Sequence, residues 1–316
     1  MPLPIIIALV CAGIMGFAMT RGGTCMVAAV SEVMHEQRYG HLAALGEASF
    51  WVLGGIALAA LFGLMPLAIN AYSLSWAVIV GGILQGVGAA LNRACVFGTV
   101  ARLGGGEWHY LMTPIGFLFG CLVVPATIGA TRAPIGQFAI AAVPWWVLAI
   151  IALLAIGRFA GFVAAARQGK ITHHIWRPHQ ATLMIGLTFV VMMLAAGAWT
   201  YPEALMQIAK RMSGGSASLT SLVLLAALLG GAILGNARRP RTHAFSAVGA
   251  GRSLIGGTLM GAGALLTPGG NDHLALIGLP FLQTYAWCAM LAMIAAIVVS
   301  IAAEDAIRAR LARKPV

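Results

Sequence analysis

Charged side chains are scarce in this sequence. Lys, Arg, Asp and Glu together make up 9% of its 316 residues, whereas soluble domains carry roughly 25%. Hydrophobic residues make up 60%, and no polar stretch between the apolar runs is long enough for a soluble domain of useful size. The composition therefore excludes a soluble globular protein and indicates an integral membrane protein.

Cysteines with metal-ligand or disulfide spacing are also lacking. The five cysteines form no CxxC pair and no zinc pattern, so we expect no disulfide framework, no metal site and no cofactor. Three of them lie among apolar neighbours inside predicted helices, where cysteine usually packs as a small apolar residue: Cys11, Cys121 and Cys288.

Acidic residues are the third scarcity, with eight Asp and Glu in the chain. We expect all of them near the ends of the apolar spans. No run of carboxylates lies within a span, which argues against a proton relay of the kind found in many pumps. Basic, glycine-rich loops with few carboxylates instead favour an anionic substrate.

Nine apolar segments approach or exceed the ~20 residues that cross a bilayer, which predicts an all-α membrane protein. They lie near residues 3–19, 45–69, 75–92, 110–130, 140–157, 181–198, 217–235, 252–267 and 281–303. The first has no basic residue before it and no small-residue cleavage pattern. We therefore expect a mature helix there, not a signal peptide.

The net charge of +11 is interpreted as membrane topology, not as nucleic-acid binding. With the N-terminus outside, three basic residues fall in outside loops and thirteen in inside loops, as the positive-inside rule requires. The outside residues are Arg132, Lys210 and Arg211. The inside residues are Arg38, Arg102, Arg158, Arg167, Lys170, Arg177, Arg238, Arg239, Arg241, Arg308, Arg310, Arg313 and Lys314.

Two glycine-rich runs are near-copies of each other. Residues 81–91 and 256–266 are identical at seven of eleven positions, and a helix-breaking patch follows each. Weaker versions of the pattern occur at residues 16–25 and 186–195. Five spans precede the polar stretch at residues 158–180, and this odd number predicts inverted repeats. We expect one membrane repeat at residues 1–157, a basic cytoplasmic linker at 158–180 and a second repeat at 181–316.

Four helical segments that follow the breaks are too short to span the membrane: residues 26–37, 96–103, 203–211 and 273–279. Lipid offers no hydrogen-bond partners to unwound backbone, so such loops must be buried in protein or line a polar cavity. We expect the four breaks to meet at the centre of the protein.

The first break contains Arg21, Gly22, Gly23 and Cys25. Its two glycines permit backbone conformations that expose N–H groups. Cys25 would begin a short helix whose N-terminus carries partial positive charge, a setting that favours a thiolate or a bound anion. The alternative is that this cysteine only packs closely at the break.

The second break contains Asn92, Arg93 and Cys95 in an equivalent setting. Two cysteines at matching places of a repeat favour a functional role more than one would. For the arginines of both breaks the alternative is an interfacial position that holds a carbonyl or a lipid phosphate. The three histidines of the linker resemble a metal cluster only superficially, and we expect them in a solvated loop: His173, His174 and His179.

These glycine, arginine and cysteine positions resemble the YeeE/YedE family of sulfur-compound membrane proteins over nearly the whole chain. The motif in the first break is Gly16, Phe17, Arg21 and Cys25. The motif at the second break is Gly86, Cys95, Gly98, Thr99, Arg102, Leu103, Gly104 and Gly106. The second copy of the glycine run contributes Gly256, Gly257, Leu259, Gly261 and Gly263.

The resemblance implies import of thiosulfate across the bacterial inner membrane. It also implies loops that dip to the centre from both sides, with cysteines that contact thiosulfate through weak S–H hydrogen bonds. Cys25 and Cys95 match two of three such cysteines, and Gly270 stands where the third would be. Either the backbone N–H groups of Gly269, Gly270 and Asn271 supply the third station, or the chain carries a different sulfur or selenium compound.

The expected substrate-binding residues are therefore Arg21, Gly22, Gly23, Cys25, Asn92, Arg93, Cys95, Gly269, Gly270 and Asn271. The expected partners are a small anionic sulfur compound, the bilayer and a cytoplasmic TusA-type sulfur-carrier protein that could contact the basic linker. Two other functions stay open, a membrane sulfur-transfer enzyme that forms a cysteine persulfide and a scaffold subunit that does not transport.

Overall fold

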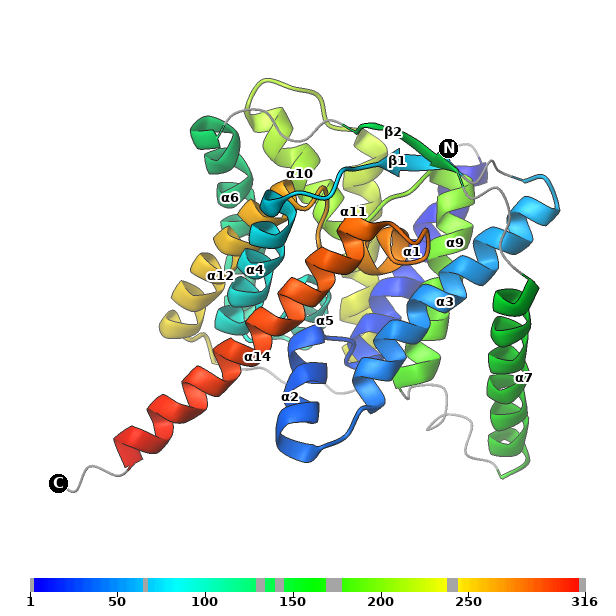
Figure 1. Ribbon diagram of the computed structural model, residues 1–316, viewed down its shortest axis with the longest axis horizontal. Coiled ribbons are helices and arrows are strands. Elements are labelled where there is room, and N and C mark those ends of the chain that lie inside the picture. Colours follow the sequence, from blue (N-terminus) through cyan, green and yellow to red (C-terminus); the bar gives the residue numbers. More distant parts are fainter. Residues whose placement is uncertain are drawn as a thin grey trace.

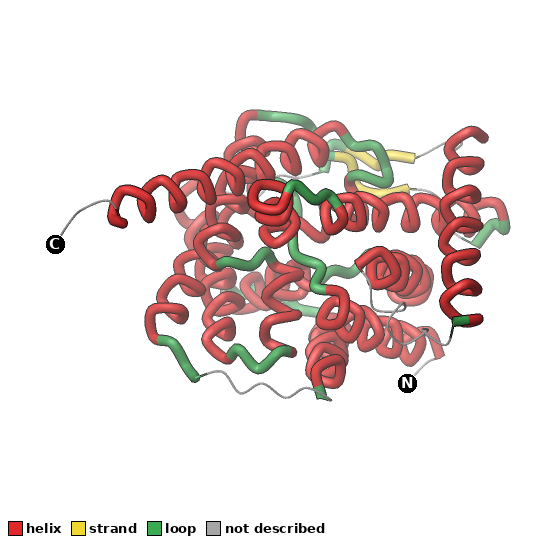
Figure 2. The backbone as a smooth tube through the Cα atoms, turned by 90° about the horizontal axis from the view of Figure 1, so that it is seen from below, coloured by secondary structure: helices red, strands yellow, loops and turns green. Residues whose placement is uncertain are grey.

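The computed structural model describes residues 3–64, 68–128, 134–139, 145–168, 178–237 and 244–312. Helices make up nearly all of this part of the chain, as Figure 2 shows. The long helices are α1 (Leu3–Gly22), α3 (Gly40–Leu61), α4 (Trp76–Asn92), α6 (Met112–Ile128), α7 (Trp145–Arg167), α9 (Pro178–Ala196), α11 (Leu219–Asn236), α12 (Ala247–Leu266) and α14 (Thr284–Ala312).

Eight helical segments of the described residues are long and apolar enough to cross a membrane. They confirm an all-α membrane protein. The ninth expected span corresponds to α12, which is 20 residues long but contains six glycines and Arg252. Its apolar character is correspondingly lower, and its place between α4 and α6 depends on close packing with these two helices.

The expectation of helix at residues 45–69 was wrong at its end. Helix α3 stops at Leu61, where Gly63 adopts a φ of +66° and the N–H of Leu64 bonds back to the carbonyl of Ala59. The chain then forms β1 (Ala68–Ala71), which pairs antiparallel with β2 (Gly136–Ala139). This small sheet, which the sequence did not suggest, lies at the same end of the molecule as the N-terminus (Figure 1).

The short helices are found close to their predicted positions. They are α2 (Met26–Glu36), α5 (Val96–Gly104), α10 (Tyr201–Met212) and α13 (Asn271–His273), which continues as the π-helical turn η2 (Leu274–Gly278). A 3-10 turn, η1 (Trp108–Leu111), leads into α6. Each short helix follows a long one directly after a break of a few residues.

Contacts between helices repeat in the two halves of the chain. If α1, α2, α3, α4, α5 and α6 are matched in order with α9, α10, α11, α12, α13–η2 and α14, the contacts among the long helices have counterparts. The α1–α11 contact corresponds to α9–α3, α4–α14 to α12–α6, and α2–α14 to α10–α6. The pairs α1–α9 and α4–α12 correspond to themselves. This pattern is the one that two halves related by a two-fold exchange would make.

The duplicated glycine run is explained by the self-corresponding α4–α12 contact. A Cβ on Gly88 or on Gly256 would lie 2.6 Å from the carbonyl oxygen of the other. Gly81 and Gly263 make the matching approach, at 2.8 and 2.5 Å. Side chains at these four positions would force the helices apart, since interiors are packed without spare volume.

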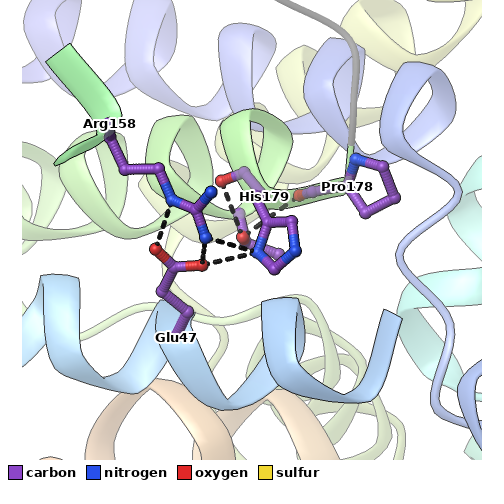
Figure 3. Close-up of polar contacts among 5 residues, drawn as sticks. Glu47, Arg158, Pro178 and His179 are labelled. Atoms are coloured by element: carbon purple, nitrogen blue, oxygen red, sulfur yellow. Dashed lines mark hydrogen bonds and ion pairs between the residues drawn. The ribbon is translucent and has the colours of Figure 1, made fainter. Parts of the chain in front are cut away.

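Helix α7 lies at the edge of the molecule and packs on α3 (Figure 1). Ion pairs among three side chains connect α7 with α3 and α9 (Figure 3). Arg158 of α7 donates to both carboxylate oxygens of Glu47 at 2.7 and 2.6 Å, and His179 of α9 lies 2.6 Å from the second oxygen. The expectation of a solvated loop was therefore wrong for His179, whereas His173 and His174 fall outside the described residues. The proposed linker at 158–180 is helical over Arg158–Arg167, and its division from the repeats stays a prediction.

Candidate functional site

The four helix breaks place four residues in equivalent positions. Cys25, Cys95, Thr200 and Gly270 are the N-caps of α2, α5, α10 and α13. All four have extended backbone, as N-caps usually do. The sequence predicted the two cysteines and Gly270 here, but not Thr200, because the weak repeat at residues 186–195 gave only the preceding helix.

The two cysteine thiols lie against each other's helix. The N–H of Met26, the first residue of α2, donates to Sγ of Cys95 at 3.3 Å. The N–H of Cys95 in turn donates to Sγ of Cys25 at 3.5 Å. Cys95 is fully buried, and Cys25 is 9% exposed. Each sulfur therefore receives positive polarity from a helix N-terminus.

Gly98 allows this close approach. A Cβ at this position of α5 would lie 2.5 Å from Sγ of Cys25 and 3.0 Å from its Cβ. Any side chain at residue 98 would therefore push the Cys25 thiol out of its place. This contact gives a physical reason for the Gly98 of the sequence motif.

Asn92 and Arg93 shape the second break in different ways. The buried Asn92 amide donates to the carbonyl of Ala94 at 2.8 Å and to Thr99 Oγ1 at 3.1 Å, and its oxygen accepts from Thr113 at 3.0 Å. Asn92 thus stabilises the loop of the second break through its hydrogen bonds. Arg93 adopts a φ of +60° and reaches outward to pair with Glu304 at 3.0 Å.

The first break holds Arg21 and two glycines. Arg21 lies in the last turn of α1, with its guanidinium 5.7 Å from the ring centroid of Phe17. Gly22 packs so closely on Ala181 of α9 that no Cβ would fit. Gly23 adopts a φ of +60° and opens the turn that leads to Cys25. The loop is thus shaped by close packing as well as by conformational freedom.

The fourth break, after α12, lacks a thiol, and its geometry leaves no room for one. A Cβ on Gly270 would collide with Cγ of Pro202 and lie 2.7 Å from its Cβ. Gly269 adopts a φ of +132°, and its carbonyl accepts from Thr267 Oγ1 at 2.7 Å. Asn271 follows at 2% exposure. The residue that fills the expected third position in this chain is therefore Pro202, from the neighbouring helix α10.

A large cavity at the end of the molecule opposite the β-sheet reaches Cys25, whereas Cys95 is not among its lining residues. We call it the charged vestibule; its volume is about 850 Å³, and its lining includes Cys25, Gly23 and Gly98. Four arginines, two histidines and five of the eight acidic residues also line it: Arg38, Arg93, Arg102, Arg308, His35, His41, Glu32, Glu36, Glu107, Glu304 and Asp305.

Every carboxylate of the charged vestibule has a basic partner. Glu304 pairs with both Arg93 and Arg308, and Glu107 pairs with Arg102. The remaining pairs are Glu32–His41, Glu36–Arg38 and Asp305–His35. The expectation of carboxylate-poor loops was therefore wrong for this side of the protein, where charges of both signs are balanced.

A second cavity opens toward the β-sheet. We call it the Glu203 cavity; it has a volume of about 440 Å³, and its lining includes Asn70, Tyr72, Glu203 and His273. It is built from the break after α9 and from the α13–η2 segment, the counterparts of the elements that line the charged vestibule. Of the four N-caps, Cys25 lines the charged vestibule, while residues next to Thr200 and Gly270 in the chain, such as Ala198 and His273, line the Glu203 cavity.

Three buried polar side chains near the N-caps lack a hydrogen-bond partner among the described residues. They are Thr24 Oγ1, Thr200 Oγ1 and Asn271 Oδ1, in side chains that are 3%, 2% and 2% exposed. Burying such groups unpaired costs about 1–3 kcal/mol each. Other described residues also hold such atoms, for example Trp51 Nε1 and Ser75 Oγ, but these three lie at helix breaks, where a polar ligand could complete their hydrogen bonding.

Broken helices that meet between two opposed cavities define a multi-pass membrane transporter. The family model described as sulphur transport matches residues 21–299, which include all four breaks. The chain belongs to this sulphur transport family, the YeeE/YedE family. A comparison with curated proteins finds no match.

Proposed function

We propose that this protein carries thiosulfate, or a closely related sulfur-containing anion, across the bacterial inner membrane. The observation that carries the proposal is the pair of buried thiols at two helix N-termini, of which Cys25 lines the charged vestibule, while the Glu203 cavity opens at the opposite end of the molecule. By the positive-inside rule the charged vestibule faces the cytoplasm and the Glu203 cavity faces the periplasm.

The thiols suit a soft sulfur anion. A thiol is a weak donor, so it can contact the terminal sulfur of thiosulfate without holding it too tightly to leave. Conduction requires this balance between entry and release. The helix N-termini of α2 and α5 favour the negative charge, and the hydroxyls of Thr24 and Thr200 are free to donate to its oxygens.

The other expected site residues are assigned supporting parts in this proposal. Arg93 lines the charged vestibule and Arg21 lies in the last turn of α1 beside the first break, and both add positive charge that attracts an anion to this side of the protein. Gly22, Gly23 and Gly269 set the course of the loops. Gly270 and Asn271 offer backbone N–H groups in place of a third thiol, and Asn92 holds Cys95 in position through the loop.

Growth of a thiosulfate-uptake-deficient strain on thiosulfate as the only sulfur source tests the proposal. Expression of this chain is expected to restore growth, and Cys95→Ala is expected to abolish the rescue at equal membrane abundance. Cys121→Ala is the matched control, because this buried thiol bonds the carbonyl of Gly261 on α12, away from the breaks. Rescue by the Cys95→Ala variant at the wild-type rate would contradict the proposal.

The adjacency of the two thiols also supports a second candidate function, sulfur transfer. A thiolate of Cys25 would attack the outer sulfur of thiosulfate, breaking its S–S bond, forming a cysteine persulfide and releasing sulfite. A TusA-type carrier at the cytoplasmic end would then take the sulfur. Mass spectrometry of the purified protein after exposure to thiosulfate separates the two, because transport alone leaves both cysteines unmodified.

A further inference from the structure

Asp272 is a carboxylate buried at the fourth helix break, after α12. It is 1% exposed, and its hydrogen bonds are with backbone N–H groups, including that of His273 at 2.9 Å and that of Tyr201. No arginine, lysine or histidine of the described residues forms an ion pair with it. A buried carboxylate at membrane depth that lacks a cation is costly and usually serves a function.

Asp272 does in the second half what Cys95 does in the first. The first N–H of α2, at Met26, is held by the Cys95 thiol. The corresponding first N–H of α10, at Tyr201, is held by the Asp272 carboxylate. The partial positive charge of the 12-residue helix α10 is therefore taken by a negative group of the protein itself. An anion that passes from the Glu203 cavity toward the thiols meets this carboxylate.

The groups around Asp272 do not neutralise it. Helix α10 presents Tyr201 and Glu203, and η2 has no titratable residue. Helix α5 presents Cys95 at its N-cap, while its one basic residue, Arg102, lines the charged vestibule and pairs with Glu107. The adjacent His273 lines the Glu203 cavity and so connects that cavity with Asp272. Two carboxylates, Asp272 and Glu203, therefore stand on the outer half of the path.

We propose that Asp272 is a proton-binding gate that couples anion entry to proton entry, an inference that rests on the proposed function. A proton from water in the Glu203 cavity binds the Asp272 carboxylate and removes its charge. The N-terminus of α10 then accepts the anion, which moves to the thiols, and the proton leaves with it on the side of the charged vestibule. The anion and the proton thus cross the membrane in the same direction, with one proton for each anion.

Proteoliposomes that contain the full-length protein test this coupling. The measurements are uptake of radiolabelled thiosulfate and the internal pH reported by trapped pyranine, with the membrane voltage clamped by potassium and valinomycin. Thiosulfate addition is expected to acidify the lumen. An inward gradient of one pH unit is expected to raise the thiosulfate accumulation ratio about tenfold, the factor that 1.4 kcal/mol supplies.

Asp272→Asn keeps the shape and removes the titratable group. We expect this variant to lose the acidification and the response to the pH gradient, whereas Asp272→Glu keeps both. Asp305→Asn is the matched control for the loss of an aspartate: this half-exposed residue lines the charged vestibule, so whatever its uptake rate, the variant should keep the acidification for each thiosulfate taken up and the response to the pH gradient. The wild-type measurement tests the coupling even if Asp272→Asn fails to fold.

Two results overturn the inference in different ways. Thiosulfate uptake by the wild type without any proton movement, or an unchanged pH response in Asp272→Asn, contradicts proton coupling and leaves the proposed function standing. Absence of thiosulfate uptake by the wild type under all gradients overturns the proposed function and, with it, this inference.

Discussion

At the scale of single residues, glycines decide where the thiols can be. Because Gly98 has no side chain, the Cys25 sulfur can lie against it, and because Gly270 has none, Pro202 can do the same there. The sequence identified both positions by spacing, but it assigned them no neighbours, because the residues they contact are distant in the chain. The structure supplies these contacts and so explains why a side chain would not fit at residues 98 and 270.

Gly98→Ala should move the Cys25 thiol, since its Cβ would lie 2.5 Å from that sulfur. We expect thiosulfate uptake to fall at least about tenfold, the consequence of a loss of ~1.4 kcal/mol of binding. Membrane abundance should stay unchanged. Gly46→Ala on α3 is the control, because no atom lies within 4 Å of its added Cβ. Equal uptake by Gly98→Ala and Gly46→Ala would contradict the assignment.

Gly270→Cys tests whether a third thiol can be restored. We expect this change to destabilise the protein by about 1–3 kcal/mol, as overpacking usually does, because its Cβ collides with Pro202. Thermal unfolding in detergent measures the effect. The double variant Gly270→Cys/Pro202→Ala is expected to recover most of the loss. A single variant as stable as the wild type would show that the fourth break has more room than its geometry indicates.

At the scale of elements, the sequence predicted the helices well and the ends of some of them poorly. The breaks after α1, α4 and α12 were found because glycine and polar residues interrupt apolar runs there. The end of α3 was missed because apolar residues continue beyond Leu61, so that hydropathy gave no signal where Gly63 turns the chain. The Glu47–Arg158–His179 contact was missed because it joins three helices from different parts of the chain.

This three-residue contact predicts how α7 is attached. Arg158→Gln should leave Glu47 buried without its main partner, and breaking a buried pair in this way costs about 3–5 kcal/mol. The double variant Glu47→Gln/Arg158→Gln should cost less than Arg158→Gln alone, and the exposed Arg167→Gln should cost little. Thermal unfolding in detergent of these three variants, the wild type and the single variant Glu47→Gln gives the comparison. Independent, additive effects of the Glu47 and Arg158 changes would contradict the attachment.

At the scale of the whole molecule, the two halves of the chain share their helix contacts. They differ in the residues at the helix breaks, where the candidate site lies. The α4–α12, α4–α14 and α12–α6 contacts follow from the duplicated glycine runs, which were visible in the sequence. The two halves differ at the N-caps, where one half carries two thiols and the other carries Thr200, Gly270 and the nearby Asp272. Charge balance in the vestibule could not be predicted, because its acids come from α2, α14 and the turn after α5.

The central claim is that the buried pair Cys25 and Cys95 forms the selective part of an anion path. Uptake of radiolabelled thiosulfate into proteoliposomes tests it most directly, with the wild type, Cys25→Ala, Cys95→Ala and Cys121→Ala reconstituted at equal density. We predict rapid uptake by the wild type and by Cys121→Ala, and a loss of at least about tenfold in each of the other two variants. Undiminished uptake by both Cys25→Ala and Cys95→Ala would contradict the claim.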